Sequence, residues 1–504
     1  MPEMLKLAEL IGGRTAIPRH SPCPKIEIDV EVWQTAIEQL AVSNWTLLGL
    51  WGETSAVNMA LLEEATSEIV VLVVPCSGGH FPSVAKRHLP AMRLERTIRD
   101  LNGLEPDGLP DTRPWLDHGR WSMRHPLGET SANAPTQPYV FLPAEGESLH
   151  QIAVGPVHAG IIEPGHFRFT ANGEVVVRLE ARLGYVHKGI EALMQGADLE
   201  RASKLAGRVS GDSTVAYAIA FARSVEAAMD TDVPARANWL RALMAELERL
   251  ANHFGDIGAI CNDASFAMMH AHCAVLRERV LRAADACFGH RLMRDCVIPG
   301  RVSIDLDQDK IAKLRALLTE IGQRFPALVE LYDNTASLQD RTVSTGILKP
   351  ELARQFGAGG FIGRASGRGF DARRAFSYPP YDQLSFEVPV LMEGDVNARV
   401  WIRIHEVKQS VSLIDQILSR LPDGAVQTNI SIKSGEGLAV VEGFRGDILV
   451  STRVADDGRI ERCHLRDPSC FQWPLLEAVI EGNIVADFPI CNKSFNCSYS
   501  GHDL

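Results

Sequence analysis

The segment NWLRALMAELERLANHFGDIGAI, residues 238–260, carries the strongest structural signal in this sequence. Its apolar positions fall on one face of an α-helix, because leucines recur every three or four residues, at Leu240, Leu243, Leu247 and Leu250. A second helical segment, residues 264–289, follows at once. Residues 404–421 repeat the spacing along one narrow apolar seam, which is typical of a helix packed in a bundle. The sequence therefore predicts a central bundle of long helices.

The segments around this bundle are richer in strand signals. Residues 26–127 mix one helical pattern with apolar runs of strand length, which predicts a small α+β domain. Residues 128–148 have the Pro, Gly, Ser and Thr content of a linker, so residues 149–504 form the second predicted domain. Within it, alternating apolar residues after Asn172-Gly173 predict a β-hairpin, and the last 70 residues return to strands and one helix. The expected fold class is α+β.

Composition narrows the classes of function. The formal net charge of -12 argues against a nucleic-acid partner. No apolar run reaches the roughly 18 residues of a membrane span, and the start lacks the apolar core of a secretory signal. We therefore expect a cytoplasmic protein. The ten cysteines form no C-x-x-C pair, so we expect reduced, mostly buried thiols and no metal or cluster bound by this chain alone.

Three polar segments are candidates for chemistry. His158 and His166 lie in a Gly- and Pro-rich loop, where they serve a ligand, a proton relay or only the turn itself. His253 and Asp256 share a helix face but lack the further ligands that a metal site needs. A cluster of arginines among glycines holds an anion, pairs with acidic groups of a partner or forms a solvated basic loop, at Arg364, Arg368, Arg373 and Arg374.

Six ordered motifs together resemble one family, at residues 155–169, 183–196, 243–258, 288–306, 378–422 and 435–447. They look like the large subunit of membrane-bound group 4 nickel–iron hydrogenases and the related 49-kDa subunit of respiratory complex I. Residues 94–118 resemble the end of the complex I 30-kDa subunit. The two parts are fused here, as in the large subunits of the formate hydrogenlyase and hydrogenase-4 type.

The resemblance places the four thiolate ligands of a nickel–iron centre on two motifs. The first falls on residues 208–213, with Ser210 and Ser213 at the cysteine positions. The second falls best on residues 495–500, where Cys497 keeps one thiolate and Ser500 replaces the other. Serine is a hard ligand that rarely ionises at neutral pH, whereas bridging two soft metals needs thiolates. We therefore predict no nickel–iron centre and no hydrogenase activity, and a buried free thiol at Cys497.

The complex I relatives imply a quinone site in the vacated cavity. Their histidine ligand matches His158, but their tyrosine position falls on Gly211, and Tyr217 is a weak substitute. Asp212 is another polar candidate, with capping of the helix that starts near Thr214 as the competing interpretation. Half of the expected quinone pair is therefore present.

The resemblance implies a subunit of a membrane-associated, ion-translocating redox complex of the NADH:quinone oxidoreductase type. The expected partners are a small subunit that carries an iron–sulfur cluster and membrane subunits that move protons or other ions. Through them the chain would lie on the inner face of the cell membrane. It would reduce a quinone or another small molecule in the cavity, or act as a non-catalytic scaffold that couples the other subunits.

Overall fold

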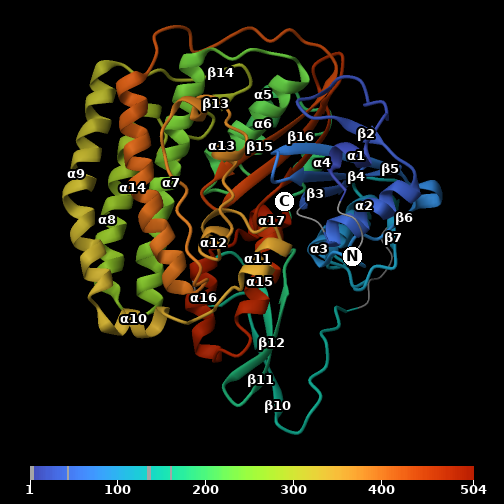
Figure 1. Ribbon diagram of the computed structural model, residues 1–504, viewed down its shortest axis with the longest axis horizontal. Helices are drawn as coiled ribbons and strands as arrows, with labels where there is room; N and C mark the ends of the chain where they lie inside the picture. The colour runs from blue at the N-terminus through green and yellow to red at the C-terminus, as the bar shows by residue number, and fades with distance from the viewer. Residues whose placement is uncertain (1–4, 43–44, 133–137, 159–161) are drawn as a thin grey trace.

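A computed structural model describes residues 5–42, 45–132, 138–158 and 162–504. The expected α+β class is confirmed: sheets dominate the N-terminal part of the chain, and long helices dominate the remainder (Figure 1). The predicted boundaries at residues 127 and 148 remain predictions.

The N-terminal part is built on a four-stranded sheet in the order β2-β5-β4-β3. Its strands are β2 (Lys25–Glu27), β3 (Trp45–Gly52), β4 (Ala56–Glu63) and β5 (Glu68–Pro75). Helices α2 (Val30–Val42) and α3 (Met92–Asn102) pack against these strands and bury the apolar residues that alternate along them. Cys470 and Phe471, from the far end of the chain, belong to the same apolar core.

Four long helices lie side by side at the left of Figure 1, and they are α7 (Ala235–Asp263), α8 (Ala267–Phe288), α9 (Gln308–Asp333) and α14 (Val396–Arg420). The predicted seam of α14 is buried at Ile404, Val407, Ile414 and Leu418. This helix begins where Asp395 accepts a hydrogen bond from the Ala398 N–H at 2.7 Å. The predicted bundle is confirmed.

A second sheet joins the two ends of the chain. Its order is β1-β15-β16-β17, with β1 (His20–Ser21), β15 (Gly435–Gly443), β16 (Gly446–Val454) and β17 (Ile460–Arg466). His20 pairs in parallel with Glu436, so residues of the N-terminal part extend a sheet of the C-terminal part. Helix α6 (Thr214–Ala228) packs on β15 so closely that a Cβ at Gly437 would overlap the Ser224 carbonyl oxygen.

The predicted hairpin is also confirmed. Strands β11 (His166–Asn172) and β12 (Val175–Arg182) pair antiparallel about Gly173, whose φ of +58° suits glycine. Strand β10 (Leu149–Val154) completes a three-stranded sheet that projects as an arm from the molecule (Figure 1).

Shorter elements connect these layers. The helices are α1 (Leu7–Leu10), α4 (Ile190–Met194), α5 (Leu199–Ala206), α10 (Ala336–Thr342), α11 (Pro350–Gln355), α12 (Gly360–Arg364), α13 (Ala372–Ala375), α15 (Ser469–Val479), α16 (Phe488–Phe495) and α17 (Tyr499–Asp503). The strands are β6 (His80–Pro82), β7 (Glu105–Asp107), β8 (Met123–Arg124), β9 (Ser131–Ala132), β13 (Val297–Ile298) and β14 (Arg301–Val302).

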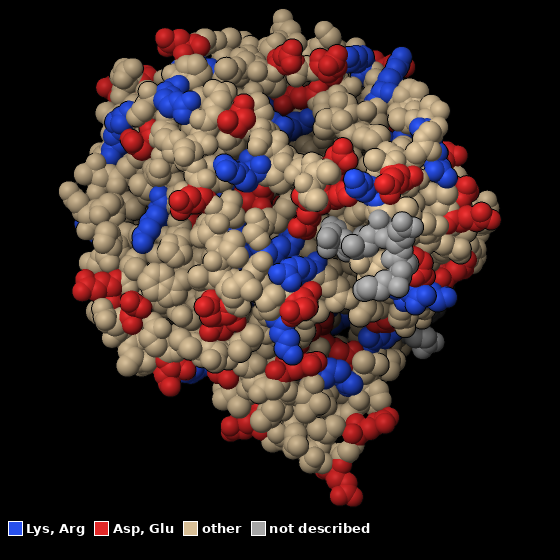
Figure 2. Space-filling model, in the orientation of Figure 1, with Lys and Arg blue, Asp and Glu red and all other residues tan. Residues whose placement is uncertain are grey.

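Three general properties follow from the coordinates. All ten cysteines are buried and unpaired, as we expected. Among the described helices, none combines the length and the apolar character needed to cross a bilayer. Acidic and basic side chains are interspersed over the face shown in Figure 2.

Candidate functional site

Two turns that are far apart in the sequence meet at the candidate site. The first, residues 207–213, joins α5 to α6, and the second, residues 496–498, joins α16 to α17. The hydroxyl oxygens of Ser210 and Ser498 lie 2.8 Å apart within one hydrogen bond between the turns. Lys188 fixes the first turn from behind, because its Nζ donates to the carbonyls of Arg208 and Val209 at 2.9 and 2.6 Å. The two motifs that the family resemblance implies are therefore in contact in the structure.

A cavity of about 380 Å³ opens between these turns and helices α7 and α8. Its lining is mostly polar and includes Ser210, Asp212, Asn252, Asp256, Arg277, Arg445, Lys493, Asn496, Ser498 and Ser500. A smaller cavity of about 140 Å³ adjoins it, since Gly211, Asp212, Asn252 and Arg277 line both. No cysteine lines either cavity among the residues that the structure describes.

Asp212 is held as a carboxylate in this cavity. Arg445 donates to both of its carboxylate oxygens, at 2.7 and 2.5 Å, and Ser210 Oγ donates to one of them at 2.8 Å. Burial alone would raise the pKa of Asp212, but the charge and hydrogen bonds of Arg445 lower it below its usual value. Asp212 therefore stays charged at neutral pH and is not a proton donor.

Our interpretation of Asp212 as the cap of α6 is wrong. Neither Asp212 nor Ser213 offers a side-chain cap to this helix. The cap comes from Glu248 on α7, whose carboxylate oxygens accept from the N–H groups of Val215 and Ala216 at 2.6 and 3.1 Å. Glu248 also lines the smaller cavity, and burial raises its pKa to about 8. It is therefore a protonated carboxyl group beside the site at neutral pH.

The predicted ligand positions are only partly brought together. Ser210 and Ser500 line the main cavity, and the Ser500 N–H donates to Glu163 at 3.0 Å. Ser213 is buried beneath Arg445, and Cys497 is buried away from the lining. Burial raises the pKa of the Cys497 thiol. Ser498, the residue after this cysteine, is the one that faces Ser210.

The two quinone candidates do not reach this cavity. Tyr217 is fully buried in α6 and donates its hydroxyl to Asp467 at 2.7 Å. His158 is half-buried in the loop after β10, and it is not among the residues that line the cavity. Residues 159–161, which follow it, lie outside the described part of the chain.

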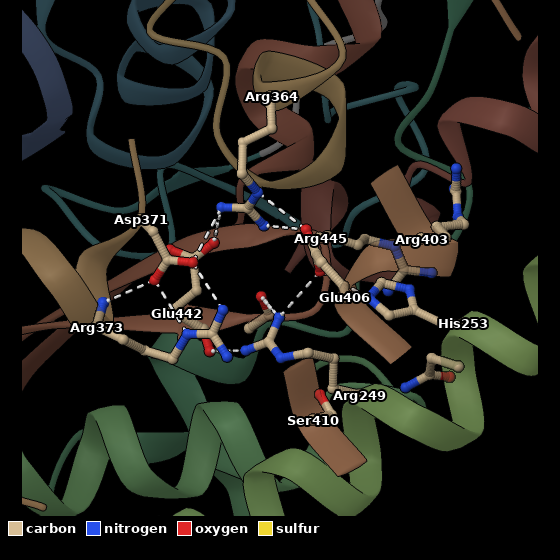
Figure 3. Close-up of polar contacts among 12 residues, drawn as sticks. Arg249, His253, Arg364, Asp371, Arg373, Arg403, Glu406, Ser410, Glu442 and Arg445 are labelled. Atoms are coloured by element: carbon tan, nitrogen blue, oxygen red, sulfur yellow. Dashed lines mark hydrogen bonds and ion pairs between the residues drawn. The ribbon is translucent and has the colours of Figure 1, made fainter. Parts of the chain in front are cut away.

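A cluster of buried ion pairs continues from the cavity into the protein (Figure 3). Asp256, in the cavity wall, accepts from Arg403 Nε at 3.0 Å. Further in, Glu406 accepts from His253 Nε2 at 2.7 Å and from Arg364 Nε at 2.9 Å, and Arg364 Nη2 lies 2.7 Å from the same carboxylate. The remaining members are Glu246, Arg249, Asp371, Arg373, Ser410 and Glu442, with Tyr381 bonded to Glu246. The cluster thus joins helices α7, α12, α13 and α14 to strand β15.

Arg364 is the centre of this cluster. It is fully buried, and it contacts Glu406, Glu442 at 3.0 Å and Asp371 at 3.3 Å. Burial would raise the pKa of Glu406, but Arg364 and His253 hold it well below its usual value. Burial and the charge of Asp371 raise the pKa of Glu442 to about 7. Our alternative of a solvated basic loop is therefore wrong for Arg364, and also for Arg368 and Arg373, which are buried as well, whereas Arg374 is exposed.

These features have only weak signals in the amino-acid sequence. His253 and Asp256 were recognised as one helix face, but their partners Glu406 and Arg403 lie about 150 residues away. Glu248 lies in a helix whose leucines recur every three or four residues, and its position alone predicts a side chain at the edge of the buried face. Its role depends on the approach of α6, which no local spacing predicts.

Three family models match parts of this chain. Residues 27–136 match the 30-kDa subunit of respiratory-chain NADH dehydrogenase, and residues 263–433 match its 49-kDa subunit. Residues 188–255 match nickel-dependent hydrogenase.

Whole-chain similarity points to the same proteins. Formate hydrogenlyase subunit 5 of Escherichia coli (strain K12) is 32% identical over 436 residues, which cover 84% of this chain and 77% of the relative. Hydrogenase-4 component G of the same organism is 30% identical, covering 86% and 78%. Among solved structures, a chain of the membrane-bound sulfane sulfur reductase, an archaeal respiratory membrane complex, superposes with a TM-score of 0.67 at 25% identity, covering 71% of this chain and 99% of that one. The chain belongs to the family of fused subunits, related to the large subunits of formate hydrogenlyase and hydrogenase-4, in which a complex I 30-kDa-like region precedes a 49-kDa- and hydrogenase-like region.

Proposed function

We propose that this chain is a subunit of a membrane-bound respiratory redox complex and that it works without a nickel–iron centre. Its relatives are named as subunits of formate hydrogenlyase, hydrogenase-4 and NADH-quinone oxidoreductase, which supports the assignment to such a complex. The expected partners are a small subunit with an iron–sulfur cluster, which delivers electrons, and membrane subunits that move ions. The chain then lies peripherally on the inner face of the membrane.

The side chains that line the cavity support the proposal that the chain works without a nickel–iron centre. Its lining offers hydroxyl, amide, carboxylate and basic groups but no thiolate among the described residues. The absence of bridging thiolates does not depend on whether Cys497 or Ser498 is aligned with the first cysteine of the motif at residues 495–500. If Ser498 replaces it, the next position with the same spacing is Gly501, where a Cβ would overlap the carboxylate of Asp467. Soft metals that need bridging thiolates do not fit this site.

We expect the purified complex to contain no stoichiometric nickel and to show no hydrogen uptake. Elemental analysis of the complex, normalised to this chain, is the measurement, with a nickel-dependent hydrogenase purified in the same way as the positive control. One nickel per chain would contradict the proposal directly.

In the catalytic form of the proposal, the cavity binds a small molecule that the partner's cluster reduces. Such a reduction consumes protons, and Glu248 beside the cavity holds one at neutral pH. A quinone is the substrate that the complex I relatives suggest, with His158 as its proton donor. Against it stand the positions of both candidates, because His158 does not line the cavity and Tyr217 supplies no second ligand. The alternative is a scaffold that only couples its partners, which the loss of thiolates and of the quinone tyrosine favours.

A quinone-reduction assay of the complex separates these forms. If a quinone is the substrate, His158→Ala lowers turnover by about 100-fold, because a general acid contributes at least this much. His150→Ala, an exposed histidine on β10, is the matched control and leaves turnover unchanged. Unchanged turnover in His158→Ala would remove His158 from the mechanism. Absence of any turnover in the wild-type complex would favour the scaffold.

A further inference from the structure

Three carboxylates and three basic side chains line the main cavity, and not all of them pair with one another. Asp212 is paired with Arg445 and Asp256 with Arg403. Only Glu163 is left without a basic partner within 4 Å among the described residues. The cavity wall also holds Arg277 and Lys493. Two positive charges therefore face one negative charge in the same space.

Arg277 is directed into the cavity rather than used for structure. It stands on α8 and lies against Gly255 of α7, where an added Cβ would meet its Cδ at 3.2 Å and its Nη1 at 3.4 Å. The absent side chain at Gly255 thus leaves the space that the guanidinium fills. In the described part of the chain Arg277 makes no hydrogen bond and no ion pair, and it lines both adjoining cavities. Arg277 is exposed, and an arginine that lines two cavities with its donors unused is suited to an anion.

Lys493 supplies the second charge from α16. It is half-buried at the cavity wall and makes no ion pair within the described residues. Its charge partly opposes the rise that burial causes in the pKa of Asp263. The Ser500 hydroxyl also lines the cavity, whereas Ser210 already donates to Asp212 and Asn252 donates to the carbonyls of Asp212 and Glu248.

We propose that this cavity binds a small anion, held between Arg277 and Lys493 with the Ser500 hydroxyl as a further donor. The proposal deepens the proposed function, since it names the chemical class of the molecule that the site takes. A neutral quinone would leave the charge of half-buried Lys493 without a partner in a partly desolvated space, which is costly, whereas an anion neutralises both Lys493 and the exposed Arg277. The mostly polar lining suits an ion or a short carboxylate better than a long apolar chain, and the volume of about 380 Å³ leaves room for water beside it.

Isothermal titration of the purified complex tests the proposal, with thiosulfate and inorganic phosphate as the anionic probes and a short-chain quinone as the neutral one. We expect at least one anion to bind once per chain and more tightly than the quinone. Arg277→Ala and Lys493→Ala should each weaken that binding by about 10- to 100-fold, because a hydrogen bond to a charged group has this value. The affinity should also fall as ionic strength rises.

The matched control is Arg279→Ala, on the same helix, whose guanidinium pairs with Glu320 at 3.5 Å and lies outside the cavity. It should bind the anion as tightly as the wild type. Binding of neither probe anion by the wild-type complex, or equal binding by Arg277→Ala, would overturn the proposal. So would loss of partner subunits from Arg277→Ala with unchanged anion affinity, because Arg277 would then be a subunit contact. The titration needs no electron transfer, so nickel content and turnover judge the proposed function separately.

Discussion

Arg364→Met is expected to lower the free energy of unfolding by about 3–5 kcal/mol. The substitution removes the one guanidinium that contacts Glu406, Glu442 and Asp371 together, all of which are buried. Asp371 keeps its pair with Arg373 and Glu406 keeps His253, but Glu442 loses its basic partner. The buried cluster then carries an added uncompensated negative charge, which costs far more than the lost attraction alone. Urea unfolding followed by tryptophan fluorescence measures the change, with the yield of assembled complex as a second readout.

The same substitution at an exposed pair provides the control. Arg315→Met breaks an ion pair with Asp415 in which both side chains are about half exposed. We expect a loss of less than about 1 kcal/mol there, because solvent screens such pairs. If Arg364→Met cost no more than Arg315→Met, the buried cluster of Figure 3 would contribute nothing to stability.

Glu248→Gln is expected to flatten the dependence of stability on pH between about 4.5 and 8. The folded protein raises the pKa of this carboxyl to about 8, from 4.5 in the unfolded chain. The folded state therefore holds its proton more tightly, so stability falls as pH rises from 4.5 through 8. The loss attributable to this group is on the order of 4 kcal/mol. Glutamine cannot ionise and removes it.

Unfolding free energies at several pH values between 5 and 8 test this expectation. Glu442 and Glu95, whose pKa values burial also raises to about 7, keep part of the slope in both proteins, so the comparison is between slopes. Glu330→Gln, at an exposed position of α9, is the control and should leave the slope unchanged. Parallel curves for Glu248→Gln and the wild type would show that the carboxyl is ionised in the folded protein.

The local amino-acid pattern was enough to predict those helices and turns whose conformation depends on residues close together in the sequence. The seam of α14 and the hairpin at Gly173 follow from apolar spacing and from the turn residues themselves. The meeting of the two serine-containing turns was also predictable, but only through the family resemblance. The resemblance placed Cys497 at the site, whereas the turn at Asn496 presents Ser498 instead. A shift of one residue within a turn changes which side chain faces inward, and no spacing rule fixes it.

The polar interior was the part that sequence reasoning missed. Arg364 and Glu248 look like ordinary surface charges in a linear pattern, because charged residues are rarely fully buried unless paired. Their partners come from elements far along the chain, such as Glu442 for Arg364 and Val215 for Glu248. Only the packing of α6, α7 and α14 against β15 brings these groups together.

The pairing of β1 with β15 bears on the order of events during synthesis. His20 leaves the ribosome about 400 residues before its partner Glu436. At a synthesis rate of roughly 5–20 residues per second, strand β15 follows β1 after on the order of 20–80 seconds, and β1 has no partner strand until then. The N-terminal core waits as well, since Phe471 belongs to it. The N-terminal part can therefore complete its sheet and its core only after residues 436–471 have been synthesised. A nascent chain that stops earlier leaves β1 unpaired and the N-terminal core incomplete.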